Sequence, residues 1–138
     1  MNSKSALAIF AHPDDIEFAA AGTLLLLRER GWKIHYFNLL SGCGGSVQMD
    51  ASTTAATRLK EAQTAAGILD AKFYLPIAHD LELTYTVELL RRVTAVVREA
   101  APSIILTHAP VDYMEDHMIT CRLAVSAAFS HGIPNFRT

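Results

Sequence analysis

The sequence predicts a three-layer, Rossmann-like α/β fold with a mainly parallel sheet. Four short apolar runs, at 6–11, 33–40, 72–77 and 103–108, are nearly continuous rather than alternating, which is typical of strands buried on both faces. Longer segments with helical spacing separate these runs. An order in which strands and helices alternate favours a parallel sheet joined by right-handed crossovers.

Helices are expected over 22–31, 52–69, 84–101 and about 117–131. Gly31 is a natural end for the first, and the second is rich in alanine with apolar residues on one face. In the third, apolar residues recur at spacings of three and four until Pro102, which a helix cannot continue through. The fourth is expected to end before Gly132 and Pro134.

Length and composition fit one globular domain covering residues 1–138. The chain has 138 residues, 51% hydrophobic and 19% charged, with a formal net charge of −2, so neither disorder nor a basic nucleic-acid surface is expected. The apolar run near the start is too short for a signal peptide or a membrane span, so we expect a cytoplasmic protein. Cys43 and Cys121 do not make a disulfide framework and are expected to be free thiols.

A polar cluster follows each of the four expected strands. The clusters are AHPDD after the first strand, SGCGGS at 41–46, AHDLE at 78–82 and HAPVDYMEDH at 108–117. Because ligands of parallel α/β sheets bind where the carboxyl ends of the strands meet, we expect these four loops to form one site. If the strand order reverses between the first and fourth strands, their two loops flank the crevice.

His12, Asp14 and Asp15, together with the Asp116–His117 pair, suggest a metal site at this edge of the sheet. Imidazole nitrogen and carboxylate oxygen are ordinary zinc ligands, and a catalytic zinc keeps one open position. A cation also makes two adjacent acids tolerable, since one can bind it while the other faces the attacking water. The alternative is that one of the acids caps the following helix.

Four other features are less specific. SGCGGS could bring backbone amides to a phosphate or form a mobile loop over a site. Arg58 and Glu61 are spaced as an intrahelical pair, and Asp80 could simply form a turn. Cys121 lies one turn from His117, but a core position is expected for it.

AHPDDIE after the first strand and DxxxDH after the fourth resemble the PIG-L/LmbE family of zinc-dependent deacetylases. Gly22–Thr23, SGCGGS, TRLKEAQTAAGIL and Asp80 extend the resemblance over nearly the whole chain. The family removes the acetyl group from N-acetylglucosamine-type substrates, which implies a hydrolase that cleaves a non-peptide amide of a small N-acetylated sugar.

The resemblance also implies roles for individual residues. His12, Asp15 and His117 match the family's ligands for Zn²⁺, and Asp14 matches its general base. Zinc would activate water and polarise the acetyl carbonyl, while Asp14 would move the water proton to the leaving amine. The candidate substrate-binding residues are Arg58, Asp80 and Tyr113.

The chain departs from the family in two respects. Met114 stands where many members have a second histidine, and Tyr113, His79 or His108 are the candidates to replace it. Family members also usually continue beyond the fourth helix, so residues 1–138 are expected to lack the C-terminal portion. The apolar fourth strand would then be an unguarded edge, covered by the missing residues or by a second copy in a homo-oligomer.

Two alternative functions remain open on the residues alone. One is a magnesium-dependent phosphoryl-transfer or receiver-type domain, with Asp80 as acceptor, although such sites usually place a lysine at the rim and prefer all-oxygen ligands. The other is a domain of the same fold that binds metal without turnover.

Overall fold

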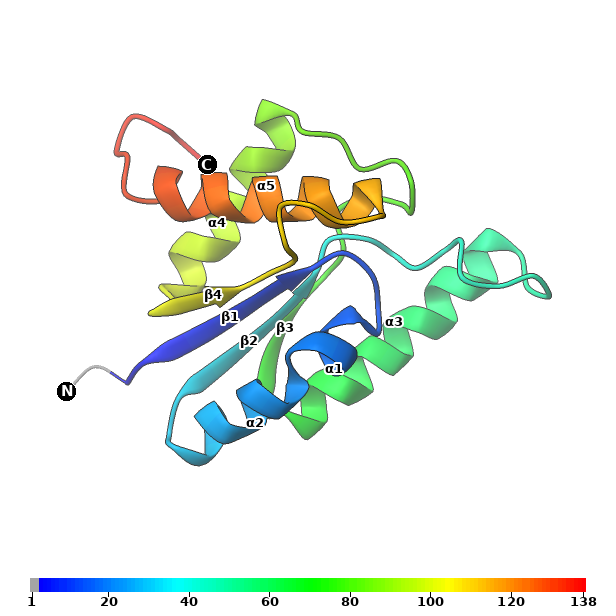
Figure 1. Ribbon diagram of the computed structural model, residues 1–138, viewed down its shortest axis with the longest axis horizontal. Coiled ribbons are helices and arrows are strands. Elements are labelled where there is room, and N and C mark those ends of the chain that lie inside the picture. The colour runs from blue at the N-terminus through cyan, green and yellow to red at the C-terminus, as the bar shows by residue number, and fades with distance from the viewer. Residues whose placement is uncertain (1–2) are drawn as a thin grey trace.

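The computed structural model describes residues 3–138 and confirms the α/β class (Figure 1). One all-parallel sheet contains four strands in the order β3-β2-β1-β4. The strands are β1 (Ser5–Phe10), β2 (Lys33–Asn38), β3 (Ala71–Tyr74) and β4 (Ile104–Leu106). The helices are α1 (Asp15–Ala19), α2 (Ala21–Glu29), α3 (Ala51–Ile68), α4 (Val87–Ala100) and α5 (Glu115–Ser130).

The helices form a layer on each face of the sheet (Figure 1). Successive residues of β1 point to opposite faces, because side chains alternate along a strand. Leu7 and Ile9 pack with α4 and α5 in one hydrophobic cluster, and Ala6, Ala8 and Phe10 pack with α1, α2 and α3 in the other. All five of these side chains are buried, which explains why β1 is a continuous apolar run.

The strand order places the switch point between β1 and β4. The chain adds β2 and β3 on one side of β1 and then returns to pair β4 on its other side, with Ala6 opposite Ile104. The loops that follow β1 and β4 therefore leave the sheet side by side at its carboxyl end. This is the crevice where open parallel sheets bind ligands.

Local signals set the helix ends. The Asp50 carboxylate accepts a hydrogen bond from the amide of Thr53 at 2.7 Å and caps α3, as expected for an acidic N-cap. The Thr86 hydroxyl caps α4 in the same way, accepting from the Leu89 amide at 3.2 Å. Helix α4 ends at Ala100, and its C-cap residue Ala101 has a left-handed conformation directly before Pro102.

Several predicted elements differ from the structure in their bounds, and one helix is additional. The short helix α1 was not expected, and it precedes α2 because the chain turns sharply at Asp14, where φ is 104°. Strand β3 ends at Tyr74 and β4 at Leu106, earlier than the apolar runs. Pro76 has no amide to donate to a ladder, and the chain after Leu106 turns away toward the rim.

Strand β4 is an edge within the described part of the chain, since it pairs there with β1 alone. Ile104 is 40% exposed on it. Of the helices in residues 3–138, none combines the length and apolar character that crossing a membrane requires.

Candidate metal centre and active site

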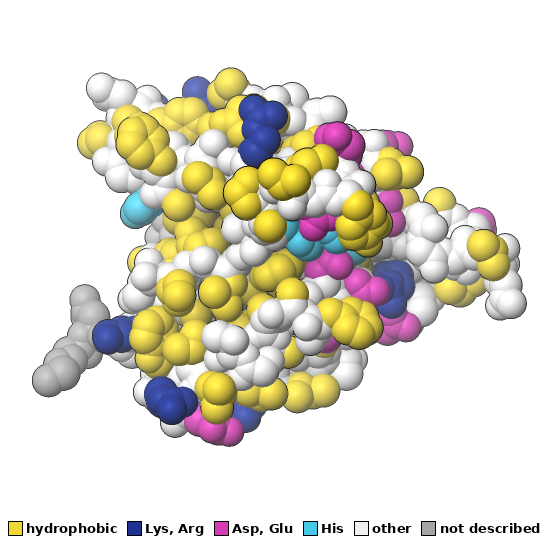
Figure 2. Space-filling view, viewed as in Figure 1, with side chains coloured by type: hydrophobic (Ala, Val, Ile, Leu, Met, Phe, Trp, Pro, Cys, Tyr) yellow, Lys and Arg dark blue, Asp and Glu magenta, His cyan; other side chains and the backbone are white. Residues whose placement is uncertain are grey.

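The loops after the four strands meet at one edge of the sheet, here called the rim, and line a cavity of about 410 Å³. Each loop contributes to the lining, as the sequence predicts. The lining residues include His12–Asp15 after β1, Gly42, Gly44 and Gly45 after β2, Asp80 and Leu81 after β3, and Tyr113, Met114, Asp116 and His117 after β4. Figure 2 shows histidine and acidic side chains gathered on this side of the molecule, with apolar side chains beside them.

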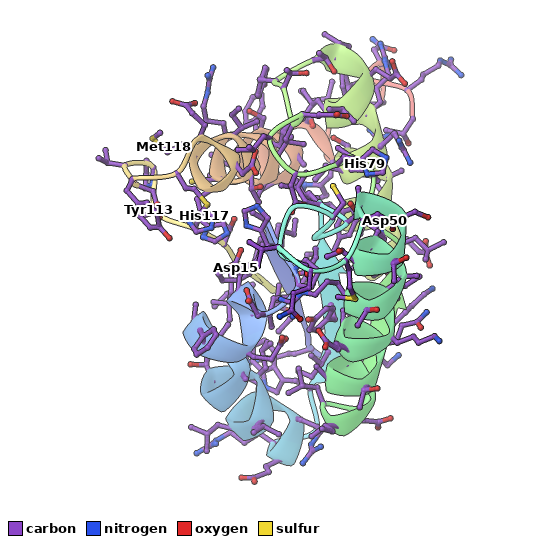
Figure 3. The ribbon with its side chains drawn as sticks, turned by 90° about the vertical axis from the view of Figure 1, so that its right-hand side faces the viewer. Asp15, Asp50, His79, Tyr113, His117 and Met118 are labelled. Atoms are coloured by element: carbon purple, nitrogen blue, oxygen red, sulfur yellow. The ribbon has the colours of Figure 1, made fainter. Side chains whose placement is uncertain are left out.

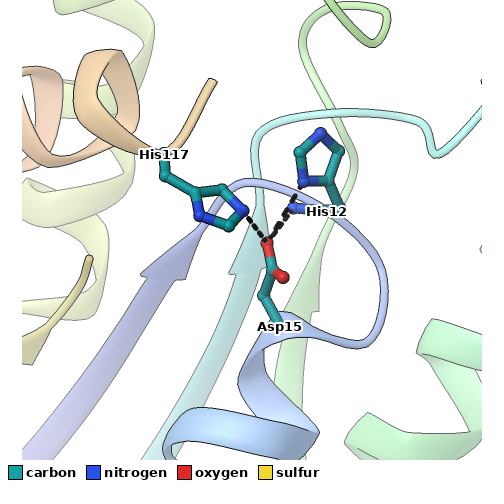
Figure 4. Close-up of side chains that lie close together, drawn as sticks. All are labelled: His12, Asp15 and His117. Carbon is teal, nitrogen blue, oxygen red and sulfur yellow. Dashed lines mark hydrogen bonds and ion pairs between the residues drawn. The ribbon is translucent and has the colours of Figure 1, made fainter. Parts of the chain in front are cut away.

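The three predicted zinc ligands converge on one point (Figure 4). The Asp15 Oδ2 atom lies 3.3 Å from Nδ1 of His12 and 3.4 Å from Nε2 of His117. The three ligand atoms all lie within 4.8 Å of one another. One carboxylate oxygen and two imidazole nitrogens at this spacing can surround a single cation.

His117 gives a further reason to expect a cation. Its side chain is 10% exposed, yet neither ring nitrogen forms a hydrogen bond with any of residues 3–138. Buried polar atoms usually have partners, because leaving one unpaired is costly. A metal ion bound at Nε2 would supply that partner, so the residues present fit a zinc ion.

The adjacent acids Asp14 and Asp15 point in different directions because of the backbone at Asp14. A φ of 104° lies in the region that residues with a side chain rarely adopt, and such strain gathers at functional sites. Asp15 turns back to accept from the amide of His12 at 2.8 Å. Asp14 occupies the N-cap position of α1, but among residues 3–138 its side chain caps nothing, so the helix-capping alternative is not supported.

Arg58 holds the loop that contains Asp14. Its guanidinium donates to the carbonyl oxygen of Pro13, to Oδ2 of Asp14 at 2.9 Å and to Oε2 of Glu61 at 2.6 Å. The Arg58–Glu61 pair expected from the helical spacing is therefore present, but Arg58 also reaches across to the rim. These bonds direct the Asp14 carboxylate toward the cavity.

The charges of the cluster shift its pKa values. Burial lowers the pKa of His12, but hydrogen bonds with Asp15 and Asp116 outweigh that effect and raise the pKa to about 9. Burial raises the pKa of Asp15, but His108 and His12 outweigh it, so the pKa lies well below its usual range. Without a metal the imidazolium of His12 therefore compensates the charge of its acidic neighbours.

Asp80 does not face the cavity as a free carboxylate. Its Oδ1 accepts from the amide of Gly42 at 2.8 Å and its Oδ2 from the amide of Gly44 at 2.9 Å. Both oxygens hold the SGCGGS loop, so these two amides are already paired and do not offer a phosphate cradle. Because both oxygens of Asp80 are occupied, these bonds do not favour Asp80 as the phosphoryl acceptor of a receiver-type domain. No lysine is among the described residues that line the cavity.

The candidate replacements for a second histidine lie in three different places. Tyr113 is 86% exposed at the cavity mouth, with its ring edge-on to His117 at 5.8 Å (Figure 3). His108 is stacked on His117 at 3.9 Å and accepts from the Ala11 amide; its Nε2 lies 3.4 Å from Oδ2 of Asp15, so it contacts the cluster but is absent from the cavity lining. His79 bonds the Ser41 hydroxyl at 3.0 Å and is absent from the cavity lining.

Asp116 was expected at the site only as the neighbour of His117, and Asp112 was not singled out from the sequence, yet both lie beside the predicted ligands. Asp116 Oδ2 lies 2.9 Å from Nε2 of His12, and Asp112 Oδ1 lies 3.2 Å from Nδ1 of His117. Their place in DxxxDH was the available signal, because Asp116 directly precedes the last ligand and Asp112 lies five residues before it, in the loop that leads into α5.

Comparison with known proteins supports the resemblance. The PIG-L family, described as GlcNAc-PI de-N-acetylase, matches residues 7–128. A diacetylchitobiose deacetylase of Thermococcus kodakarensis is 32% identical and aligns with 96% of this chain and 52% of its own length.

Two solved structures have the same fold. An N,N'-diacetylchitobiose deacetylase from Pyrococcus horikoshii has a TM-score of 0.89 at 28% identity, over 98% of this chain and 53% of that one. GalB, the 4-carboxy-2-hydroxymuconate hydratase from Pseudomonas putida, has a TM-score of 0.84 at 30% identity, over 91% and 56%.

The present chain spans about half the length of the curated relatives it matches. The family profile nevertheless covers the whole strand-end rim, from β1 through most of α5. The fold, the HPDD loop at the switch point and these matches together show that the chain belongs to the PIG-L deacetylase family.

Proposed function

We propose that the chain is the metal-binding part of a zinc-dependent hydrolase that removes the acetyl group from an N-acetylglucosamine-type sugar. The observation that carries the proposal is the convergence of His12, Asp15 and His117 on one point within 4.8 Å. Deacetylase relatives support the substrate class.

The proposed division of labour follows the geometry. His12, Asp15 and His117 hold the ion, which when bound activates water and polarises the acetyl carbonyl. Asp14 accepts the proton of the attacking water and delivers it to the leaving amine. Arg58 orients Asp14 through the 2.9 Å bond to Oδ2, so it acts on the reaction through the base rather than by contacting the acetyl group.

Substrate recognition is proposed for the exposed wall of the cavity. Tyr113 stands at the mouth, where an aromatic face can stack on a sugar ring. Arg58, which also lines the cavity, offers a cation near the sugar hydroxyls. Asp80 is proposed to shape the site by holding the SGCGGS loop, which differs from the direct substrate contact that the family resemblance implies.

A hydratase is the second candidate, because GalB is 30% identical with a TM-score of 0.84. A metal-activated water and a carboxylate base could add water to a carbon–carbon double bond as well as hydrolyse an amide. The family description and the deacetylase relatives favour hydrolysis of an amide.

We also infer a reducing, cytoplasmic setting, since no disulfide joins the described cysteines Cys43 and Cys121.

The test begins with chelated protein reloaded with zinc. Acetate release from N-acetylglucosamine and N,N'-diacetylchitobiose is compared between the zinc-loaded chain, the chelated chain and Asp14→Asn. Slow, zinc-dependent release that Asp14→Asn abolishes is the expected result. Equal release by all three samples refutes the proposal, and zinc-dependent hydration of an unsaturated dicarboxylate in place of acetate release would establish the hydratase.

A further inference from the structure

Each of the two histidines in the metal cluster lies between two carboxylates. His12 turns Nδ1 toward Asp15 at 3.3 Å and Nε2 toward Asp116 at 2.9 Å. His117 turns Nε2 toward Asp15 at 3.4 Å and Nδ1 toward Asp112 at 3.2 Å. The two rings thus face the shared Asp15 oxygen with different nitrogens, and each has an acid behind it.

The outer acids are themselves held in place. Asp116 is 1% exposed, and its Oδ2 accepts from the Leu81 amide at 3.0 Å as well as from His12. Asp112 Oδ1 accepts from the Met114 amide at 3.0 Å at the start of α5. A buried carboxylate needs hydrogen-bond donors, and the His12 ring is the side-chain donor to Asp116. Asp112 is partly buried, and its Oδ1 lies beside Nδ1 of His117 without forming a hydrogen bond to it.

We propose that Asp116 and Asp112 are positioning residues that select the ligating nitrogen of His12 and of His117. Asp116 accepts Nε2–H of His12, which leaves the Nδ1 lone pair for the ion. Asp112 lies 3.2 Å from Nδ1 of His117, and a proton kept at Nδ1 by this carboxylate leaves Nε2 for the ion. Carboxylates that hold the far nitrogen of a ligand fix its tautomer and its ring orientation. The inference rests on the metal-binding half of the proposed function.

A second metal ion is the competing explanation for Asp112, because His108, Asp112 and His117 also lie close enough to share one. The rings of His108 and His117 are stacked at 3.9 Å with an interplanar angle of 9°. The lone pair of an imidazole nitrogen lies in the plane of its ring. Two rings that are stacked face to face therefore cannot both point a nitrogen lone pair at the same ion. His108 Nε2 also accepts from the Ala11 amide at 3.0 Å. Asp112 is therefore assigned to His117, as the carboxylate beside its Nδ1 atom, rather than to a second ion.

The two acids are expected to differ in one respect. Asp116 also fixes Leu81, whose φ of 63° is left-handed and whose side chain is 82% exposed at the cavity mouth. Loss of Asp116 should therefore weaken metal binding and also raise KM, since the wall beside the ion is released. Loss of Asp112 should weaken metal binding with less effect on KM.

The test measures zinc affinity of the 138-residue chain by competition with a chromogenic chelator. Asp112→Ala and Asp116→Ala are expected to bind zinc about 10–100-fold more weakly than the parent. Asp112→Asn and Asp116→Asn keep an acceptor oxygen and should recover part of that loss. Glu115→Gln is the matched control, because it removes a neighbouring exposed charge that contacts no histidine among the described residues.

Circular dichroism of the metal-free variants separates misfolding from lost affinity, and the Asn variants decide the question if an Ala variant does not fold. The proposal is overturned if the folded variants bind zinc as tightly as the parent, if Glu115→Gln weakens binding equally, or if the parent takes up no zinc. A parent that binds zinc without releasing acetate would refute the proposed deacetylation and leave this inference standing.

Discussion

Gly42 packs closely against Pro13 of the first rim loop and Arg58 of α3, and replacing it with alanine tests that packing. Its φ is +75°, and a Cβ there would lie 3.0 Å from Pro13 Cγ and 3.1 Å from Cβ and Cγ of Arg58. The left-handed backbone costs a residue with a side chain about 1–2 kcal/mol. Displacing Pro13 and Arg58 adds about 1–3 kcal/mol, as overpacking does elsewhere.

Two other glycines separate these effects. Gly31 has a φ of +80° but would meet no described atom within 4 Å, so Gly31→Ala incurs the backbone cost alone. Gly67 lies in α3 with neither constraint, so Gly67→Ala should gain about 0.5–1 kcal/mol from reduced chain entropy.

Thermal unfolding of the three variants in one buffer gives the comparison. At about 3 °C per kcal/mol for a domain of this size, Gly42→Ala should melt about 3–9 °C below Gly31→Ala, and Gly67→Ala slightly above the parent. The contact also predicts a lower kcat/KM for Gly42→Ala, since Pro13 and Arg58 adjoin the proposed base. If Gly42→Ala and Gly31→Ala melted together, the packing argument would be wrong.

Three further predictions follow from the site and the helix caps. Asp14→Asn should keep zinc affinity and lose about 10²–10⁴-fold in hydrolysis, because the amide cannot accept a proton; unchanged hydrolysis would make Asp14 a structural residue. Met114→His should raise kcat at least about tenfold with little change in zinc affinity, because an imidazole at the cavity wall can donate a proton; an unchanged kcat would show that this chain does not use the family's second histidine. The amide of Thr53 lowers the pKa of Asp50, so the cap of α3 contributes stability above the unfolded pKa of about 4 that is lost as the pH falls through the lower folded value. Denaturant titrations of Asp50→Asn from pH 7 to pH 3 should accordingly show a smaller acid loss than the parent.

The sequence by itself determined the class of fold and the location of the site. Strands buried on both faces must be apolar throughout, and helices that pack on a sheet must repeat their apolar residues every three or four positions. Both kinds of element can therefore be predicted from the sequence without a structure. The polar residues after each strand indicated the rim in the same way. These are local patterns, since each depends on residues that are neighbours along the chain.

The tertiary structure decided what the individual side chains do. Asp80 and Arg58 were expected near substrate, and both line the cavity. The structure adds that Asp80 holds the amides of Gly42 and Gly44 and that Arg58 holds Pro13 and Asp14. The sequence indicated that His12 and Asp116 belong to one site, but it did not show that the two side chains, 104 positions apart in the chain, contact each other directly. Whether a hydrogen bond forms depends on differences of a few tenths of an ångström between donor and acceptor. These distances are set by how the four strands pair in the sheet and by where the loops after them meet, not by spacing along the chain.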